Sequence, residues 1–281
     1  MNTACRELRH SGHTLGLVPT MGALHEGHMS LVAAAKSGCD AVAASIFVNP
    51  TQFGPNEDYS KYPRTFDEDC HKLESAGVDL LFAPAAEDMY PPGNTTVVDP
   101  GEIATRLDGA SRPGHFRGVA TIVTRLFNIA QPDRAYFGQK DAAQVAVIRH
   151  VVGDLNLPVA LVICPIVREP DGLAMSSRNR YLSSAERKRA LVLSQALHAA
   201  EDLATTGETS AQALTTAMRQ FFPGGPHLRL DYAALVDPNT LLPIDDASRG
   251  ALVAIAAWVG ATRLIDNLLL DDRNIVSKLS S

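Results

Sequence analysis

Residues 17–28, which read LVPTMGALHEGH, place two histidines three positions apart directly after an apolar segment. Imidazoles at this spacing can ligate a metal ion, donate hydrogen bonds to a phosphate, or make ordinary surface hydrogen bonds. Gly22 and Gly27 flank the first histidine, and glycine allows both a tight turn and the close approach of a ligand to the backbone. The sequence therefore presents three alternatives: a metal site, a phosphate site, or a turn with surface histidines.

The phosphate alternative has the clearest physical basis. A helical zinc site usually reads HExxH, with histidines four positions apart, whereas His25 and His28 are three apart and have no cysteine close by. A strand that ends near Thr20, followed by a glycine turn and a helix, instead directs backbone N–H groups toward an anion. In an open parallel sheet, the carboxyl end of a strand is also where ligands bind.

Two further polar stretches favour the same interpretation. FGQKDAAQ places Lys140 directly after another apolar strand, although a single lysine in this position is otherwise a solvated charge. GLAMSSRN combines two hydroxyls with Arg178, whose planar guanidinium suits bidentate binding of phosphate. The structural alternative for this second stretch is a loop that precedes a helix capped by Ser183 or Ser184.

The composition is that of an ordinary globular protein and argues against several functional classes. The chain of 281 residues is 46% hydrophobic and 20% charged, and its net charge of −6 argues against a general nucleic-acid binder. No apolar run approaches the roughly 20 residues of a membrane span, and the first residues lack the apolar core of a signal peptide. The four cysteines are widely spaced. We therefore expect a cytoplasmic protein with reduced thiols and neither a disulfide framework nor a zinc site.

Apolar strands alternate with helices through the first part of the chain. The predicted strands are residues 14–20, 41–50, 78–84, 134–138 and 159–167. The predicted helices are residues 28–38, 65–77, 118–132 and 141–156. Such alternation is typical of a parallel sheet covered by helices on both faces. We therefore expect residues 1–167 to form an α/β domain with a Rossmann-like, doubly wound parallel sheet.

The pattern changes after Val167. A polar loop leads into long helices around residues 184–206 and 210–222, and two strands follow at residues 228–237 and 251–260. Because the strand–helix alternation does not continue here, we expect residues 168–281 to form a smaller C-terminal α+β domain.

Several stretches together resemble a known family. TMGALHEGH is similar to the HIGH-type signature of the nucleotidyltransferase superfamily, and AMSSRN stands where that superfamily carries its Lys-Met-Ser-Lys-Ser loop. FVNPTQFGPNEDYSKYPRT, SRPGHFRGVATIV, FGQKD and VREPDGLAMSSRNRYL resemble the pantoate–β-alanine ligases, or pantothenate synthetases, in particular. These motifs follow the family's order over nearly the whole chain. The resemblance implies a Rossmann-like domain that binds nucleotide and pantoate, followed by a C-terminal lid domain.

The resemblance implies an ATP-dependent ligase of pantothenate biosynthesis. In that family, ATP and (R)-pantoate form pantoyl adenylate and pyrophosphate, and β-alanine then attacks the adenylate to give pantothenate and AMP. ATP would act as a substrate together with Mg²⁺, with no protein ligand of the metal assigned. The family is usually a homodimer, and neither nucleic acid nor membrane is an expected partner.

The resemblance also assigns roles to individual residues. The expected catalytic residues are His28, His25, Lys140 and Arg178. The family's final signature histidine, here His28, acts as proton donor or stabilises the transition state. The expected ATP-binding residues are Met21, Gly22, Ala23, Leu24, His25, Glu26, Gly27, His28, Gly138, Gln139, Lys140, Asp141, Val167, Met175, Ser176, Ser177 and Arg178. Pantoate and β-alanine are expected to contact Gln52 and Gln144.

Some positions depart from the family pattern. Gln139 stands where the family commonly has glutamate, and Ala143 stands where it often has a second glutamine. Ala174 replaces the lysine that opens the superfamily's loop. For Arg112 and His115, a role at the substrate and a role in holding a loop are equally compatible with the sequence.

Particular residues distinguish the expected ligase from two alternative functions. A different nucleotidyltransferase should lack FVNPTQFG and the helix that carries Gln144. A non-catalytic nucleotide-binding protein of this fold should have lost His28, Lys140 or Arg178, and all three are present. An aminoacyl-tRNA synthetase is not expected, because the chain shows no evident anticodon-binding module.

Overall fold

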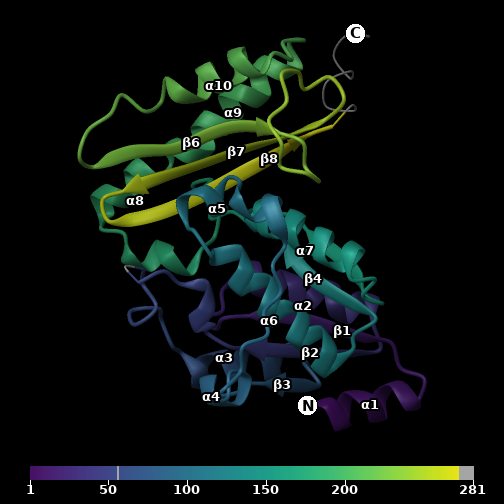
Figure 1. The fold of residues 1–281 in the computed structure, drawn as a ribbon. Helices are drawn as coiled ribbons and strands as arrows, with labels where there is room; N and C mark the ends of the chain where they lie inside the picture. Colours follow the sequence, from purple (N-terminus) through teal and green to yellow (C-terminus); the bar gives the residue numbers. More distant parts are fainter. Residues whose placement is uncertain (56, 272–281) are drawn as a thin grey trace. The chain divides into compact units, whose positions relative to one another are not determined.

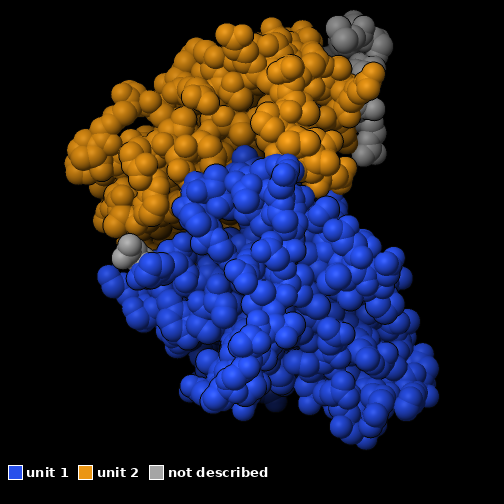
Figure 2. All heavy atoms as spheres, viewed as in Figure 1, with its two compact units in different colours: residues 1–139, 144–167 blue, residues 140–143, 168–281 orange. Residues whose placement is uncertain are grey.

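The computed structural model describes residues 1–55 and 57–271, which form two compact units (Figures 1 and 2). The first unit contains residues 1–139 and 144–167, and the second contains residues 140–143 together with the described chain from residue 168 onward. The sequence pattern places residues 140–143 before a boundary at Val167, whereas in the structure they pack with the second unit. One direct contact of this segment is the hydrogen bond from Asn267 Nδ2 to the backbone oxygen of Lys140, at 2.9 Å.

The first unit is built on a parallel sheet of five strands in the order β3-β2-β1-β4-β5. Its strands are β1 (Leu15–Thr20), β2 (Ala41–Ile46), β3 (Leu80–Phe82), β4 (Arg134–Gly138) and β5 (Ala160–Cys164). β1 pairs with β2 on one side and with β4 on the other, so the direction in which strands are added reverses between β1 and β4. This confirms the doubly wound α/β fold predicted from the sequence.

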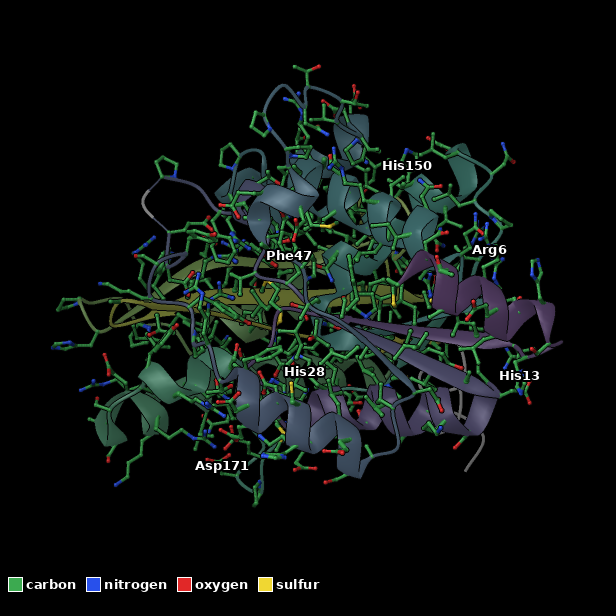
Figure 3. The ribbon with its side chains drawn as sticks, turned by 90° about the horizontal axis from the view of Figure 1, so that it is seen from below. Arg6, His13, His28, Phe47, His150 and Asp171 are labelled. Atoms are coloured by element: carbon green, nitrogen blue, oxygen red, sulfur yellow. The ribbon has the colours of Figure 1, made fainter. Side chains whose placement is uncertain are left out.

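Helices cover both faces of this sheet. They are α1 (Asn2–His10), α2 (Glu26–Gly38), α3 (Phe66–Ser75), α4 (Ala86–Met89), α5 (Asp108–Ser111), α6 (His115–Ala130) and α7 (Ala142–Asp154), with short 3₁₀ turns η1 (Pro50–Gln52), η2 (Gly101–Thr105) and η3 (Gln139–Asp141). α2 packs on β1, β2 and β4, and its apolar side chains share a core with Val18 and Val42. In Figure 3, Arg6 of α1 and His150 of α7 lie on the opposite side of the sheet from His28 of α2.

The second unit packs helices on an antiparallel sheet of three strands in the order β6-β7-β8. Its elements are η4 (Ser177–Tyr181), α8 (Ser184–Ala190), α9 (Val192–Thr205), α10 (Ala211–Arg219), β6 (Leu228–Val236), β7 (Ala251–Val259) and β8 (Thr262–Leu270). α9 lies on β7 and β8, and α10 lies on β6. An apolar core that includes Leu197, Leu214 and Ile255 joins the helices to the sheet.

The sequence pattern predicts two strands here, and the structure has a third, β8. The two-residue turn Gly260–Ala261 connects β7 to β8, and Gly260 has the positive φ of 58° that such tight hairpin turns favour. β8 lacks a continuous apolar run because it carries Asp266 and Asn267, both of which are nevertheless buried.

The helix predicted around residues 184–206 is interrupted at Leu191, between α8 and α9. Leu191 keeps right-handed helical angles, and its carbonyl accepts a hydrogen bond from the Ser194 hydroxyl at 3.0 Å. The same carbonyl accepts the helical hydrogen bond from the Gln195 N–H at 3.1 Å, so the Ser194 hydroxyl shares this acceptor with the helix.

A close approach of two backbones positions Gln52. The interior of α6 lies against η1, and a Cβ built on Gly118 would lie 2.7 Å from the Gln52 nitrogen and closer still to the Thr51 carbonyl. A side chain at residue 118 would therefore push η1 away from α6.

We expect Gly118→Ala to lower the free energy of unfolding by about 1–3 kcal/mol, the usual effect of overpacking a buried contact. Gly153→Ala, in α7, is the matched control because a Cβ there meets no atom within 4 Å. That control should be neutral or stabilising by up to about 1 kcal/mol. Urea unfolding of both variants measures the difference, and equal stabilities would show that η1 does not need the glycine.

Candidate active site

The loop between β1 and α2 turns through left-handed backbone conformations. Gly22 has a φ of 80° and Ala23 a φ of 51°. A Cβ on Gly22 would lie 3.1 Å from both Asp69 Oδ2 and Ile46 Cγ2, so glycine satisfies the backbone angle and the space together. The Gly22 N–H donates to Thr20 Oγ1 at 3.2 Å, which ties the turn to the end of β1.

A buried carboxylate holds this loop. Asp69, only 1% exposed, accepts hydrogen bonds from the backbone N–H groups of Ala23 and Leu24, each at 2.8 Å. Lys72, one turn further along α3, donates to the Leu24 carbonyl at 2.8 Å. From the sequence alone, Asp67, Glu68 and Asp69 in the first turn of α3 are expected only to stabilise the helix through its dipole. Asp69 and Lys72 are therefore site residues that sequence reasoning missed, because their partners lie 45 to 48 positions away in the chain.

His25 and His28 form the start of α2. His25 is the N-cap residue, and its Nδ1 accepts from the Gly27 N–H at 3.2 Å. His28 Nδ1 accepts from the His25 N–H at 3.3 Å, so the two side chains complete a reciprocal capping box. The ring centroids are 4.1 Å apart. An Nδ1 that accepts a hydrogen bond places the proton of the neutral ring on Nε2, which makes Nε2 the donor nitrogen of each histidine.

Gln52 lies beside the first residue of this loop. Its side chain is buried, with Nε2 donating to Met21 Sδ at 3.0 Å and Oε1 accepting from Asn49 Nδ2 at 3.1 Å. Asn49 also donates to the Gly118 carbonyl and accepts from the Tyr90 hydroxyl at 2.8 Å. The structure thus brings Gln52 to the Met21–His28 loop and adds Asn49, which sequence reasoning treated only as the end of a strand.

Arg112 and His115 hold the backbone of Gln52. His115 Nδ1 lies 2.8 Å from the Gln52 carbonyl oxygen, to which Arg112 donates at 3.3 Å. Arg112 also forms two hydrogen bonds to Glu57, at 2.9 and 2.5 Å. Burial raises the pKa of Glu57, but the hydrogen bonds and charge of Arg112 outweigh it, so the pKa is lowered overall. Of the two roles left open by the sequence, these contacts support the holding of a loop.

The residues after β4 and β5 stand at the same edge of the sheet as the end of β1, because these strands are parallel. Gly138 ends β4, and Gln139, Lys140 and Asp141 form η3, in which Lys140 Nζ lies 3.4 Å from Asp141 Oδ1. Within the first unit, Gln144 is half-buried in the first turn of α7, and Val167 follows β5.

Ala143, where the sequence departs from the family pattern, is 4% exposed beside Gln144 in the first turn of α7. A longer polar side chain at this buried position would need its own hydrogen-bond partner.

The loop Met175–Arg178 belongs to the second unit. Ser176 caps η4 by accepting from the Arg178 N–H at 3.3 Å, and Ser177 is buried. Ser183 caps α8 in a capping box with Glu186, which confirms the N-cap predicted there. The capping interpretation of this stretch is therefore confirmed, and phosphate binding by Met175–Arg178 remains a prediction.

The described residues contain no group of three or more His, Cys, Asp or Glu side chains placed to hold a metal ion. Within residues 1–55 and 57–271, every helix falls short of the length and apolar character that a membrane span requires.

The first unit presents a glycine turn and a helix N-terminus at the carboxyl end of β1, next to the reversal of strand order at β4. This is where doubly wound folds bind nucleotides. Fold and site together define the class of α/β nucleotide-binding enzymes.

Comparisons with known proteins narrow this class. The sequence profile described as pantoate-beta-alanine ligase matches residues 1–269. A pantothenate synthetase of Acidobacterium capsulatum is 58% identical over 290 residues, covering 99% of this chain and 97% of the relative. The crystal structure of pantothenate synthetase from Thermus thermophilus superposes with a TM-score of 0.88 at 49% identity, covering 94% and 96% of the two chains.

A second solved structure, pantoate-beta-alanine ligase from Francisella tularensis complexed with Beta-gamma ATP and Beta-alanine, has a TM-score of 0.75 at 36% identity and covers 95% of each chain. The protein described here belongs to the pantoate–β-alanine ligase family.

We expect Asp69→Asn to lower the free energy of unfolding by about 1–3 kcal/mol, because the new NH₂ group would face a buried backbone N–H and leave it unpaired. Asp67→Asn removes the same charge at an exposed position of the same helical turn and should cost only about 0.3–1 kcal/mol, the usual effect of the helix dipole. Urea unfolding compares the two variants. Equal stabilities would contradict the role given to the Asp69 carboxylate.

Proposed function

We propose that this protein condenses (R)-pantoate with β-alanine through a pantoyl-adenylate intermediate, releasing AMP and pyrophosphate. As a member of its family, it is a ligase that forms a C–N bond, with ATP as a substrate. The observation that supports the adenylate route best is the Met21–His28 loop, which combines a helix N-terminus with two imidazoles at the carboxyl end of β1. Such a site suits the phosphates of a nucleotide.

We assign ATP to residues from both parts of the chain. Met21–His28, Gly138, Gln139 and Val167 would contact the nucleotide from the first unit. Lys140, Asp141 and Met175–Arg178 would serve it from the second, with Lys140 and Arg178 neutralising phosphate charge. Residues 1–167 would thus bind nucleotide and pantoate, and residues 168–281 would act as a lid domain.

The first step needs no strong base, because the attacking group is already a carboxylate. A pantoate carboxylate oxygen bonds to the α-phosphorus of ATP while the bond to the pyrophosphate oxygen breaks. Catalysis then consists of alignment and of stabilising charge on the transferring phosphate. His25 and His28 suit this role, because their Nδ1 atoms are used in the capping box and Nε2 is the donor of the neutral ring. The histidines are therefore oriented before ATP arrives.

Gln52 and Gln144 would hold pantoate. A neutral amide can hydrogen-bond a hydroxyl or carboxylate without the ion pair that would weaken the nucleophile. Gln52 is held by Asn49 at its side chain and by His115 at its backbone, which restricts its position. In the second step, the neutral amine of β-alanine attacks the acyl carbon of the adenylate, AMP leaves with the electrons of the acyl–oxygen bond, and the nitrogen releases one proton to water as the amide forms.

We further propose that Mg²⁺ accompanies the triphosphate and that the enzyme is a cytoplasmic homodimer. Carboxylate and phosphate oxygens are the usual ligands of Mg²⁺. No set of three potential metal-binding side chains stands together in the described part of the chain, so phosphate oxygens and water would supply most of the coordination.

His28→Gln should lower kcat by about 10²–10³-fold, as expected when one preorganised donor to the transition state is lost. Glutamine at this position of a capping box can still accept from the His25 N–H, so the helix start should persist. His71→Gln, on the exposed surface of α3, is the matched control. Steady-state kinetics measure the catalytic loss, and circular dichroism checks that the variant is folded. Near-normal turnover in folded His28→Gln would contradict the catalytic role assigned to His28.

The adenylate should form without β-alanine. With Mg²⁺, ATP and pantoate, the enzyme should exchange labelled pyrophosphate into ATP, and it should not do so when pantoate is omitted. Gln144→Ala should slow this exchange because it weakens pantoate binding, and it should leave ATP binding largely unchanged. If the exchange requires β-alanine, the stepwise route is wrong.

A further inference from the structure

The segment 168–179 of the second unit is a folded loop that places Leu173 in the apolar core. Its start is a tight turn in which the Gly172 N–H donates to the Glu169 carbonyl at 2.8 Å, and the Glu169 N–H donates to the Leu173 carbonyl at 2.8 Å. Arg168 and Ala174 form an isolated antiparallel bridge that closes this turn. The Met175–Arg178 segment follows directly, so its position depends on how the turn is fixed.

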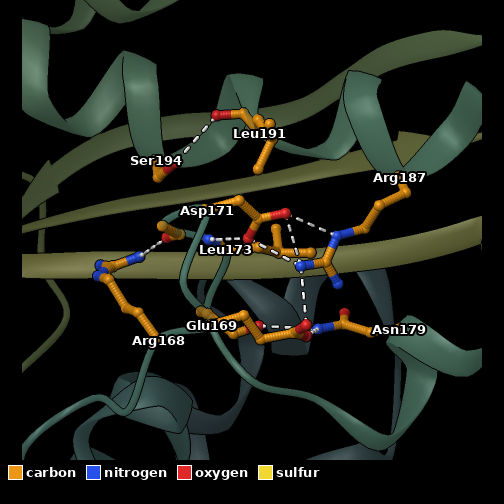
Figure 4. A network of polar contacts seen from close by, with 10 residues as sticks. Arg168, Glu169, Asp171, Leu173, Asn179, Arg187, Leu191 and Ser194 are labelled. Atoms are coloured by element: carbon orange, nitrogen blue, oxygen red, sulfur yellow. Dashed lines mark hydrogen bonds and ion pairs between the residues drawn. The ribbon is translucent and has the colours of Figure 1, made fainter. Parts of the chain in front are cut away.

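Arg187 of α8 fixes the turn from outside the loop (Figure 4). Its guanidinium donates to both carboxylate oxygens of Asp171, at 2.7 to 3.0 Å, and forms an ion pair with Glu169 Oε2 at 2.7 Å. Hydrogen bonds from Arg187 lower the pKa of Glu169 and of Asp171, so both carboxylates are charged near neutral pH. One guanidinium thus spans the two acids of the turn.

Glu169 extends this contact to the far end of the loop. Its other oxygen, Oε1, accepts from Asn179 Nδ2 at 2.7 Å, and the same Asn179 amide donates to the Ala174 carbonyl at 3.1 Å. Asn179 and Ala174 are the residues on either side of Met175–Arg178. The contacts Arg187–Glu169–Asn179–Ala174 therefore run from α8 to both ends of that segment.

A second anchor acts at the base of the turn. Arg168 donates to both carboxylate oxygens of Asp266 on β8, at 2.7 and 3.1 Å, and to the Gly172 carbonyl at 3.0 Å. This anchor fixes the start of the loop to the sheet. Its hydrogen bonds lie at the turn and at β8, whereas those of Glu169 reach Asn179 at the far end of the loop.

We propose that Arg187 is a positioning residue for the ATP-phosphate loop and acts through Glu169 and Asn179. This inference rests on the proposed function, in which Met175–Arg178 contacts the phosphates of ATP. The ion pairs of Arg187 are partly exposed, with side-chain exposures of 25% for Arg187, 26% for Glu169 and 38% for Asp171. Water partly screens pairs this exposed, and every partner of Arg187 among them lies in the turn of the loop, so the network acts on the position of that loop.

The test is Arg187→Gln in the full-length enzyme, with Arg189→Gln as the matched control on the exposed side of α8. A displaced loop should lower kcat/KM for ATP by about 10- to 100-fold, the usual effect of a misplacement near 1 Å. The KM values for pantoate and β-alanine should stay within about twofold, since the contacts of Arg187 lead to the phosphate loop and not to Gln52 or Gln144. Arg187→Lys should recover only part of the loss, because an ammonium cannot bridge two carboxylates as a planar fork does.

Two measurements distinguish a displaced loop in Arg187→Gln from a general loss of folding stability. Amide hydrogen exchange should become faster in residues 168–179 of Arg187→Gln and stay unchanged in β6–β8, with the melting temperature nearly that of the parent. The ATP effects of Arg187→Gln and Asn179→Ala should be non-additive, because both variants interrupt the same chain of contacts.

An unchanged kcat/KM for ATP would overturn the positioning role and leave the proposed function intact. Equal increases in the KM values of ATP, pantoate and β-alanine would do the same. If the parent enzyme instead makes no pantothenate from ATP, pantoate and β-alanine, the proposed function fails. Faster exchange of residues 168–179 in Arg187→Gln would then still show that Arg187 orders the loop.

Discussion

The carboxylate of Asp69 accepts two backbone hydrogen bonds from the loop after β1, and the geometry of this loop and of the start of α2 depends on this contact. The hydrogen bonds are charge-assisted and buried, which makes them stronger than neutral ones. They fix Ala23 and Leu24, so that His25 reaches the N-cap of α2 and His28 its first turn. Leu24 of this loop also packs in the apolar core that includes Val18 and Val32. The loop is therefore ordered by α3 and by this core, which is why the imidazoles can be preorganised without a ligand.

The loop in the second unit is ordered by the same physical means. Carboxylates again bind donors of the protein: Glu169 and Asp171 bind Arg187, and Asp266 binds Arg168. Each of these negative charges is neutralised locally by a donor or a cation. These carboxylates therefore order both loops without adding a strong negative field of their own.

The parallel sheet was predictable because its strands are apolar runs bounded by glycine, proline and asparagine, a signal that local sequence carries. β8 was not, because Asp266 and Asn267 interrupt its apolar pattern, and their burial is compensated by Arg168 and the Lys140 backbone, which are distant in sequence. The glycines and histidines of Met21–His28 indicated a phosphate site. Their capping box could not be predicted, because histidine is not a usual N-cap residue. Asp69 and Arg187 act through tertiary contacts that no local pattern encodes.

The hydrogen bond between Asn267 and the Lys140 backbone joins positions 127 residues apart. On the ribosome, a chain is made from its N-terminus at about 5–20 residues per second, and early segments begin to fold first. The turn after β4 that carries Lys140 must wait for β8 before it gains this contact. The turn that carries Lys140 is therefore completed late in biosynthesis, after the whole parallel sheet has already been made. A nascent chain that stops short of β8 would carry the β1–α2 loop in full but would lack this anchor for Lys140.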